Sequence, residues 1–380
     1  MPVRRLSYVP ALDGLRAVAV LLVLIFHCGV PGFQGGWIGV DIFFVLSGFL
    51  ITRILSDEWR TTGDISILRF YLRRTFRLVP ALWTMLLLTN AFLVLARAPS
   101  AFSHALAADA VASFFYVINW TGAFQVGDRT LYGHAWSLSV EEQFYIFWAM
   151  IFPPLLRWRG TLGAAQALMI MLVASTLCRL VLAWYGYEST IKMNRIGAGF
   201  EACLFGCMAA LYHLQASVRR RLTSIFLKCR YLGSGALAIL LGSALTEMPV
   251  NPYCNIILQL TKYAASAVII IEVIAMQSLA NRVLASPPLV RIGVISYGVY
   301  LWHYPLIASA HFFPNFTPQS ALGMAAFVGA VALVLATLSY HCIERPFLKL
   351  KAKIGHPEAG ISRSIARRAE HRLHRADEGW

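Results

Sequence analysis

The sequence predicts an all-α membrane protein, a polytopic bundle of about ten transmembrane helices. Three observations support this prediction. Hydrophobic residues make up 58% of the chain and charged residues only 13%, with a mean hydropathy of +0.63, which is outside the range of soluble domains. Apolar runs near the roughly 20 residues that cross a bilayer recur along nearly the whole chain. Most Lys and Arg residues then fall on one side of the resulting topology.

Taken in order, the apolar runs predict ten spans, each placed to within a few residues. These spans are residues 11–30, 37–56, 77–97, 134–155, 163–184, 196–214, 232–247, 256–277, 290–311 and 319–342. The first span is followed directly by a second, so we expect it to stay as an anchor and not to be cleaved. We divide the chain into a transmembrane domain, residues 1–346, and a basic tail, residues 347–380.

The net charge of +15 is distributed as the positive-inside rule describes. The loops on the predicted outer side hold few basic residues, namely Arg97, Arg129, Lys192 and Arg195. Both termini are therefore expected in the cytoplasm. We expect the tail to be disordered or to lie on anionic lipid. No aromatic residues are interleaved with its charges, so a nucleic-acid partner is not expected.

Arg16 and His27 are the most informative residues of the first span. They are eleven residues apart, about three helical turns, so they share a face and lie roughly 16–17 Å apart along the axis. Ionisable groups inside a span are costly and usually face a protein or water-lined interior. One interpretation is a polar track through the membrane. The alternative is that Arg16 reaches one interface while His27 lies at headgroup level on the other.

The second span brings a carboxylate to the level of His27. The turn between the first two spans is short, so the spans must be antiparallel neighbours, and Asp41 lies at a depth similar to that of His27. A carboxylate that orients an imidazole fixes its tautomer and raises its basicity, which suits a general base. The alternative is a hydrogen bond that only pairs the two helices.

The third span begins in a basic cluster, RFYLRRTFRLVPAL. Arg74 and Arg77 are three residues apart, so they share a helix face and can bind one phosphate group together. The alternative is that they only mark the cytoplasmic end of the span, where the positive-inside rule predicts basic residues anyway.

Two later spans contain polar groups that are unlikely to face lipid. The fourth span opens with HAWSLSVEEQFYIFW, which places Glu141 two turns inside and Gln143 near it. Trp136, in the same motif, also fits an interfacial aromatic belt. The ninth span, ISYGVYLWHYPLI, contributes Tyr300 and His303, and a single histidine in a span can equally be a packing hydrogen bond.

Taken together, these motifs resemble the acyltransferase 3 family of integral membrane acyltransferases. Six segments occur in the family's order: LDGLRAVAVLLVLIFH, GVDIFFVLSGFLIT, FYLRRTFRLVPALW, HAWSLSVEEQFY, SYGVYLWHYPL and SYHCIERPF. The family's Arg-x10-His motif falls on Arg16 and His27, its Arg-x-x-Arg motif on Arg74 and Arg77, and its W-S-L-x-V-E motif on Trp136 to Glu141.

The resemblance covers residues 8 to about 348. It implies transfer of an acyl group, commonly acetyl from cytoplasmic acyl-CoA, to a hydroxyl of a carbohydrate on the extracytoplasmic side. The implied acceptors are a surface polysaccharide, a lipopolysaccharide or a glycolipid, and the implied location is the bacterial inner membrane. Acyl-CoA is expected as a co-substrate, with no permanently bound cofactor and no metal. The chain looks like the stand-alone form, without the SGNH-hydrolase domain that some longer members carry.

The resemblance and the residue pattern together assign roles. We expect His27 to be the catalytic base, with Asp41 or Glu141 orienting it, and both direct transfer and an acyl-His27 intermediate stay open. The residues expected to bind acyl-CoA are Arg16, Arg74 and Arg77. Those expected to bind substrate are Trp136, Gln143, Tyr300 and His303.

One segment departs from the family pattern. The family places an Arg closely followed by an acidic residue, whereas Arg195 and Glu201 are further apart here. Arg179 and Glu201 are charges near the outer leaflet that we expect to pair, with Lys192 or Arg195 as competing partners.

Two other classes of protein remain as alternatives. A proton-coupled transporter or exporter also uses histidines and carboxylates inside spans, although it usually shows repeat symmetry, and no clear internal repeat is seen. A membrane scaffold does not need Arg16, His27, Asp41 and Glu141 in apolar segments.

Overall fold

The computed structural model describes residues 8–95, 101–123, 131–186, 197–229, 231–247, 251–310 and 317–354. Within these ranges every regular element is a helix, which confirms the all-α prediction. The elements are α1 (Pro10–His27), α2 (Ile38–Thr62), α3 (Ile67–Leu95), α4 (Ala101–Phe114), α5 (Ile118–Ala123), η1 (Gly133–Ala135), α6 (Trp136–Trp184), α8 (Gly199–Leu214), α9 (Ala216–Lys228), α10 (Leu232–Ala244), α11 (Pro252–Ala275), α12 (Leu279–Leu284), α13 (Pro287–Val294), α14 (Ser296–Ala310), α15 (Ala321–Ser339), η4 (Tyr340–Glu344) and α16 (Arg345–Ile354).

The predicted count of about ten spans is not confirmed. In the described part of the chain, six helices are long and apolar enough to cross a membrane, or up to seven if the bent pair α9–α10 forms one span. The six stretches are Pro10–His27, Ile38–Thr62, Ile67–Leu95, Gly133–Trp184, Pro252–Ala275 and Ala321–Lys349. The predicted spans do coincide with helices, so the difference lies in their lengths and breaks.

Three features account for this difference. Helix α6 contains both predicted spans 134–155 and 163–184, separated by a break at Gly160, whose φ of 63° and ψ of −169° are not helical. The predicted spans 196–214 and 232–247 appear as α8 and α10, which have 16 and 13 residues, fewer than the roughly 20 needed to cross a bilayer. The predicted span 290–311 is divided into α13 and α14.

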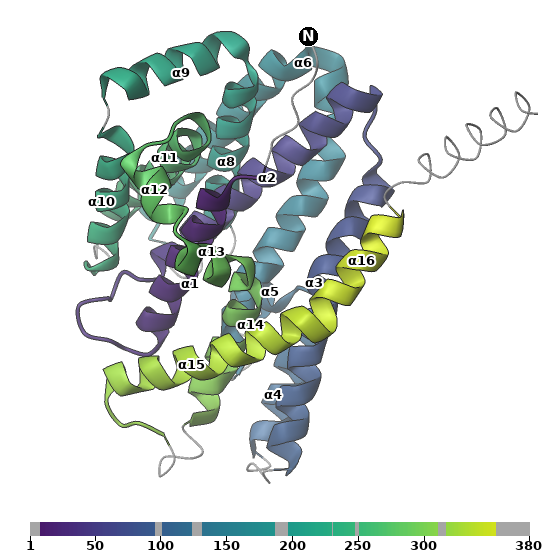
Figure 1. Cartoon of the computed structure of the whole chain (residues 1–380), viewed down its shortest axis with the longest axis vertical. Helices are drawn as coiled ribbons and strands as arrows, with labels where there is room; N and C mark the ends of the chain where they lie inside the picture. Colours follow the sequence, from purple (N-terminus) through teal and green to yellow (C-terminus); the bar gives the residue numbers. More distant parts are fainter. Residues whose placement is uncertain are drawn as a thin grey trace, which may run out of the picture.

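Helices α1 and α2 are antiparallel neighbours, as the short turn between them predicts (Figure 1). Two glycines of this region permit the close approach, because a Cβ atom on Gly36 would collide with the carbonyl oxygen of Leu22 and one on Gly39 with that of Ala19. The basic helix α9 lies at one end of the molecule, and the α1–α2 turn lies toward the other end (Figure 1).

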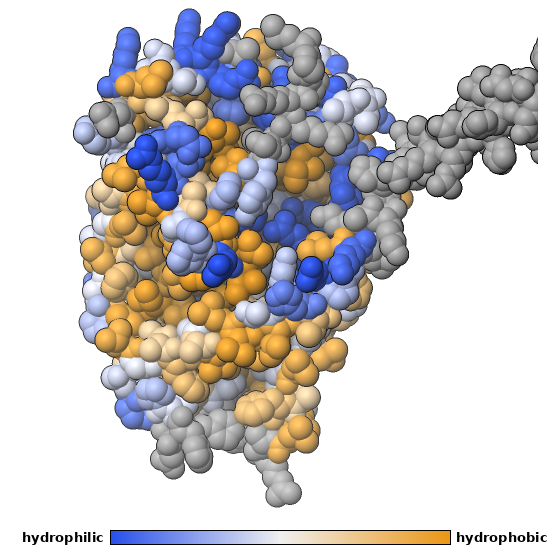
Figure 2. Space-filling model, in the orientation of Figure 1, coloured by the Kyte–Doolittle hydropathy of each residue, from blue (hydrophilic) through white to orange (hydrophobic). Residues whose placement is uncertain are grey.

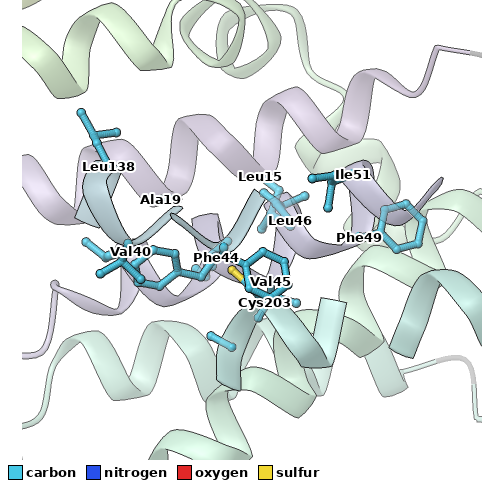
Figure 3. Close-up of a cluster of buried hydrophobic side chains, with 14 of the residues drawn as sticks. Leu15, Ala19, Val40, Phe44, Val45, Leu46, Phe49, Ile51, Leu138 and Cys203 are labelled. Atoms are coloured by element: carbon cyan, nitrogen blue, oxygen red, sulfur yellow. The ribbon is translucent and has the colours of Figure 1, made fainter. Parts of the chain in front are cut away.

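The core lies where α2 packs between α1, α6 and α8. A Cβ atom on Gly48 of α2 would collide with the backbone of Cys203, and one on Gly206 of α8 with the backbone of Val45. The two helices therefore meet backbone to backbone. Figure 3 shows part of this core, in which Phe44 and Phe49 lie among aliphatic side chains and Cys203.

Apolar side chains cover much of the outer surface. Leu87 is 71% exposed, Ile170 is 69% exposed and Leu322 is 72% exposed. Hydrophilic side chains gather at the end that carries α9, and hydrophobic ones dominate below it (Figure 2). An apolar surface of this extent marks a membrane-facing surface, and it supports an integral membrane protein.

One buried charge is paired inside the bundle between α6 and α8. Arg179 of α6 forms an ion pair with Glu201 of α8, as expected, and its Nη2 donates to Oε1 of Gln259 at 2.5 Å. The competing partners Lys192 and Arg195 lie outside the described residues, as do the predicted outer-side residues Arg97 and Arg129 and residues 355–380 of the tail. The start of the tail is helical, as α16.

Candidate active site

A cavity of about 360 Å³ opens between α1, α2, α3, α6 and α14. Five of the predicted site residues line it: Arg16, Arg74, Arg77, Glu141 and Tyr300. Its other polar walls come from Ser47, Ser137, Glu142 and Tyr297, and apolar side chains of α2 such as Phe43, Leu46 and Leu50 complete it. The cavity therefore combines three arginines, three carboxylates (Asp13, Glu141 and Glu142) and an apolar wall.

The three arginines of the cavity differ in their ion-pair partners. Arg16 pairs with Asp13 on its own helix at 3.3 Å. Arg74 lies 3.9 Å from a carboxylate oxygen of Glu141 and 3.8 Å from one of Glu142. Arg77 forms no ion pair with any described residue, and its side chain is exposed in the cavity wall. It is the cation best placed to bind an anion from outside the protein.

Glu141 lies at the centre of a hydrogen-bond network. Its Oε1 accepts from the hydroxyls of Ser47 on α2 and Tyr145 one turn further along α6, and Arg74 lies over the Tyr145 ring at 3.4 Å. Among the described residues, no hydrogen bond joins Glu141 to His27. Its observed position suits holding Arg74 and shaping the cavity, and a direct catalytic role for it stays a prediction.

His27 lies beyond the cavity, at the C-terminal end of α1. Its imidazole is half-buried, and its Nδ1 lies 2.9 Å from Nε2 of His303 on α14. The Nδ1 of His303 lies 2.6 Å from the backbone carbonyl oxygen of Tyr300, whose ring lines the cavity. The rings of His134 and Tyr304 pack against this pair. Tyr300 thus connects the cavity to the histidine cluster.

The expected contact between Asp41 and His27 is not present. No hydrogen bond joins the two in the described part of the chain. Asp41 is 5% exposed and interacts electrostatically with Lys262 and Arg179 instead. The reason is helical phase: Gly39 faces α1, and Asp41 is two residues further on, about 200° around the helix, so it faces away from α1. Similar depth alone was not sufficient to pair them.

The four residues expected to bind substrate have different positions. Tyr300 lines the cavity, and His303 lies behind it. Trp136 packs edge to face against Phe44, with ring centroids 6.1 Å apart, and neither it nor Gln143 is in the cavity wall. Substrate contact by Trp136 therefore finds no support in this cavity.

Gln143 supports the cavity wall from behind. It exchanges two hydrogen bonds with the amide of Asn119, at 2.9 and 3.0 Å, and donates to the carbonyl oxygen of Tyr116 at 2.8 Å. Tyr116 lines the cavity and has a φ of 54°, a left-handed conformation that only a well-determined environment maintains in a non-glycine residue. Gln143 fixes a cavity residue and does not line the cavity itself.

Among the site residues that were not singled out from the sequence are two that fix Tyr300. His134 precedes Trp136 in the HAWSLSVEEQFY motif, and Ser137 lies inside it, so the motif itself was the available signal. The Tyr300 hydroxyl donates to the backbone carbonyl of His134 at 2.9 Å and lies 2.6 Å from Oγ of Ser137. The start of α6 thereby fixes Tyr300, the cavity-wall residue whose carbonyl oxygen contacts His303.

Comparison with known proteins identifies the family. A family model described as an acyltransferase domain, acyltransferase 3, matches residues 9–341. The chain is 32% identical over 360 residues to the peptidoglycan O-acetyltransferase OatA of Listeria monocytogenes, covering 90% of this chain and 56% of that protein. It is 33% identical over 360 residues to the putative peptidoglycan O-acetyltransferase YrhL of Bacillus subtilis, covering 89% of this chain and 55% of that protein.

A third relative is the O-acetyltransferase OatA of Staphylococcus aureus, 29% identical over 352 residues, with 90% of this chain and 57% of that protein covered. The chain thus spans somewhat more than half the length of these relatives. No solved structure matches it. The family model covers the helices that form the cavity and the histidine cluster, and the chain therefore belongs to the acyltransferase 3 family of integral membrane acyltransferases.

Proposed function

We propose that this chain transfers an acetyl group from acyl-CoA, on the cytoplasmic side of a bacterial inner membrane, to a hydroxyl of a carbohydrate on the other side. Family membership supports acyl transfer, and the names of the relatives support acetyl as the group and peptidoglycan as the first acceptor to test. The distribution of Lys and Arg along the sequence supports the sidedness.

One observation carries the proposal. A single cavity has arginines in its wall, and Tyr300 of that wall contacts His303, the hydrogen-bonded partner of the half-buried His27. Arg77 and Arg16 are placed to bind the diphosphate of acyl-CoA. The apolar wall of α2 accommodates the extended arm that bears the thioester. Arg16 and His27 lie roughly 16–17 Å apart along α1, so such an arm brings the acyl group toward the opposite end of the helix.

The chemistry requires one base. The Nε2 of His27 takes the proton of the acceptor hydroxyl as its oxygen bonds to the thioester carbonyl carbon. The carbon–sulfur bond then breaks, and the leaving thiolate receives that proton from His27. The products are an acetyl ester on the carbohydrate and free CoA, and His27 returns to its starting state. Asp41 faces away from this position, and its catalytic role stays a prediction.

The test is the acetyl-ester content of surface glycans, extracted without alkali and measured by mass spectrometry. Cells that express the wild-type chain should carry acetyl esters on a glycan, and cells without the gene should lack them. Purified protein in proteoliposomes should form the same ester when acetyl-CoA and the glycan are on opposite sides. Transport of an unchanged solute with no ester formed would favour the transporter alternative and contradict the proposal.

A further inference from the structure

Two hydrogen bonds in series connect the backbone carbonyl of Tyr300 to His303 and His303 to His27. The carbonyl oxygen of Tyr300 lies 2.6 Å from Nδ1 of His303, and Nε2 of His303 lies 2.9 Å from Nδ1 of His27. His303 is 0% exposed, whereas His27 is half-buried. The two imidazoles are almost parallel, with an interplanar angle of 27°.

The backbone carbonyl of Tyr300, at one end of this series of hydrogen bonds, determines which nitrogen of each imidazole carries a hydrogen. A carbonyl oxygen only accepts, so Nδ1 of His303 must carry a hydrogen. In a neutral imidazole the other nitrogen is then an acceptor, so Nε2 of His303 accepts from Nδ1–H of His27. His27 is left with an unprotonated Nε2, the nitrogen that the proposed reaction uses.

The surroundings of His303 favour its neutral form. The rings in contact with it are those of His27, His134, Tyr300 and Tyr304. Among the described residues, no carboxylate forms a hydrogen bond or an ion pair with it. A fully buried imidazolium without a counter-charge is costly, so His303 acts as a neutral acceptor.

We propose that His303 is a positioning residue that holds His27 in the tautomer with a free Nε2, in the place where a carboxylate was expected. This inference rests on the proposed function. The hydrogen bond also fixes the plane of the His27 ring. It becomes stronger when His27 takes a proton, because the Nδ1–H of an imidazolium then donates to Nε2 of His303.

Two substitutions at position 303 separate this role from packing. Asparagine places its amide near the site of Nδ1, so His303→Asn keeps a donor for Tyr300 but does not reach His27. Glutamine is one methylene longer, so His303→Gln places its amide oxygen near the site of Nε2 and keeps an acceptor for His27.

We expect kcat of the purified His303→Asn variant to fall about 100-fold, at the lower end of the range for general-base catalysis. We expect His303→Gln to stay within about tenfold of the wild type, since it keeps the acceptor. The KM for acetyl-CoA should change less than about twofold in both, because the arginines are untouched. Equal kcat values in the two variants would overturn the proposal.

A second measurement needs no variant at position 303 to fold. The proposal predicts that His27 carries its hydrogen on Nδ1 in the resting wild-type protein. Nitrogen-15 spectra of histidine-labelled protein in lipid report the tautomer, and the signal missing from His27→Gln identifies His27. A hydrogen on Nε2 of His27 would refute the inference even with the acetyltransferase activity intact. A wild-type protein without transferase activity would instead contradict the proposed function.

Discussion

The three arginines of the cavity look alike in sequence but differ in their partners. Arg74 is held by two carboxylates and a tyrosine ring, whereas Arg77 has no ion pair within the described part of the chain. A cation without an ion pair can bind a phosphate without first losing a protein partner, whereas a paired cation also supports the fold. Substitutions of Arg74 and of Arg77, the two residues of the Arg-x-x-Arg motif, should therefore have different effects.

Replacing Arg77 by Ala should raise the KM for acetyl-CoA about 10- to 100-fold, because a hydrogen bond to a charged group contributes roughly 1.5–3 kcal/mol. Arg77→Lys should restore only part of the lost affinity for acetyl-CoA, since lysine lacks the planar guanidinium group. Steady-state kinetics on purified protein measures both effects. Unchanged acyl-CoA kinetics in an Arg74→Ala, Arg77→Ala double variant would assign the motif to topology alone.

Replacing Arg74 by Ala should also lower the thermal stability of the purified protein, in contrast to Arg77→Ala. The change leaves Glu141 and Glu142 without their cation, and breaking a buried pair costs about 3–5 kcal/mol, an upper bound here because both carboxylates are partly exposed. The midpoint of thermal unfolding in detergent measures it. Equal midpoints for the two alanine variants would contradict this division of roles.

His27→Ala should reduce transfer about 10²- to 10⁴-fold, the usual contribution of a general base, with normal membrane insertion. His341→Ala is a matched control, since His341 is an exposed histidine outside the cavity wall, and it should retain wild-type activity. The assay is acetyl-ester formation at equal amounts of inserted protein. Activity of His27→Ala within a few-fold of the wild type would end the assignment of His27 as the base.

At the scale of elements, the glycines of α2 decide which side chains enter the site. Gly39 brings α2 against α1, and Gly48 brings it against α8. With these faces in contact, Ser47 on the adjacent face lines the cavity, where it donates to Glu141, and Asp41 interacts electrostatically with Lys262 and Arg179. Close backbone contacts with α1 and α8 therefore set the rotation of α2 about its own axis.

Gly48→Ala should destabilise the protein by about 1–3 kcal/mol, because the added methyl group would collide with the backbone of Cys203 and α8 must move away. Gly235→Ala on α10 is the matched control, since nothing lies within 4 Å of its added Cβ atom. That change should be neutral or slightly stabilising. Thermal unfolding of the two variants tests the difference, and equal loss of stability would show that α2 and α8 do not pack this closely.

At the scale of the whole molecule, the basic helix α9 lies at one end, and the α1–α2 turn lies toward the other (Figure 1). If the positive-inside rule sets the orientation, the first end is cytoplasmic and His27 lies in the outer part of the membrane. Acyl donor and acceptor then approach from opposite faces, and only the acyl-bearing arm needs to enter the protein.

Two cysteines introduced into a cysteine-free background test this orientation. Gln34→Cys, in the exposed α1–α2 turn, should react with a membrane-impermeant thiol reagent in intact spheroplasts. Ser362→Cys, in the tail, should react only after the membrane is opened. The reverse pattern would place His27 near the cytoplasm and exclude transfer across the membrane, although the acyltransferase assignment would remain.

The sequence by itself determined the helical membrane class, the family and five of the polar residues that line the cavity. Hydropathy and charge distribution reflect the solvent that each segment meets, so they can be interpreted without knowing the packing. The spacing of Arg16 and His27, and of Arg74 and Arg77, depends only on the pitch of one helix, so their shared faces were also predictable.

Only the tertiary structure decided the number of long spans, the partner of His27 and the positions of Gln143 and Asp41. The number of long spans depends on helix lengths and on breaks such as Gly160. The contacts of His27 and Asp41 depend on the rotation of one helix against another, which the close contacts of Gly39 and Gly48 set. Asp41 lies at the right depth on α2 but faces away from α1. His303, 276 residues after His27, forms the hydrogen bond with His27 instead. Depth follows from position along a helix, but contact follows from packing, and packing is a property of the whole bundle.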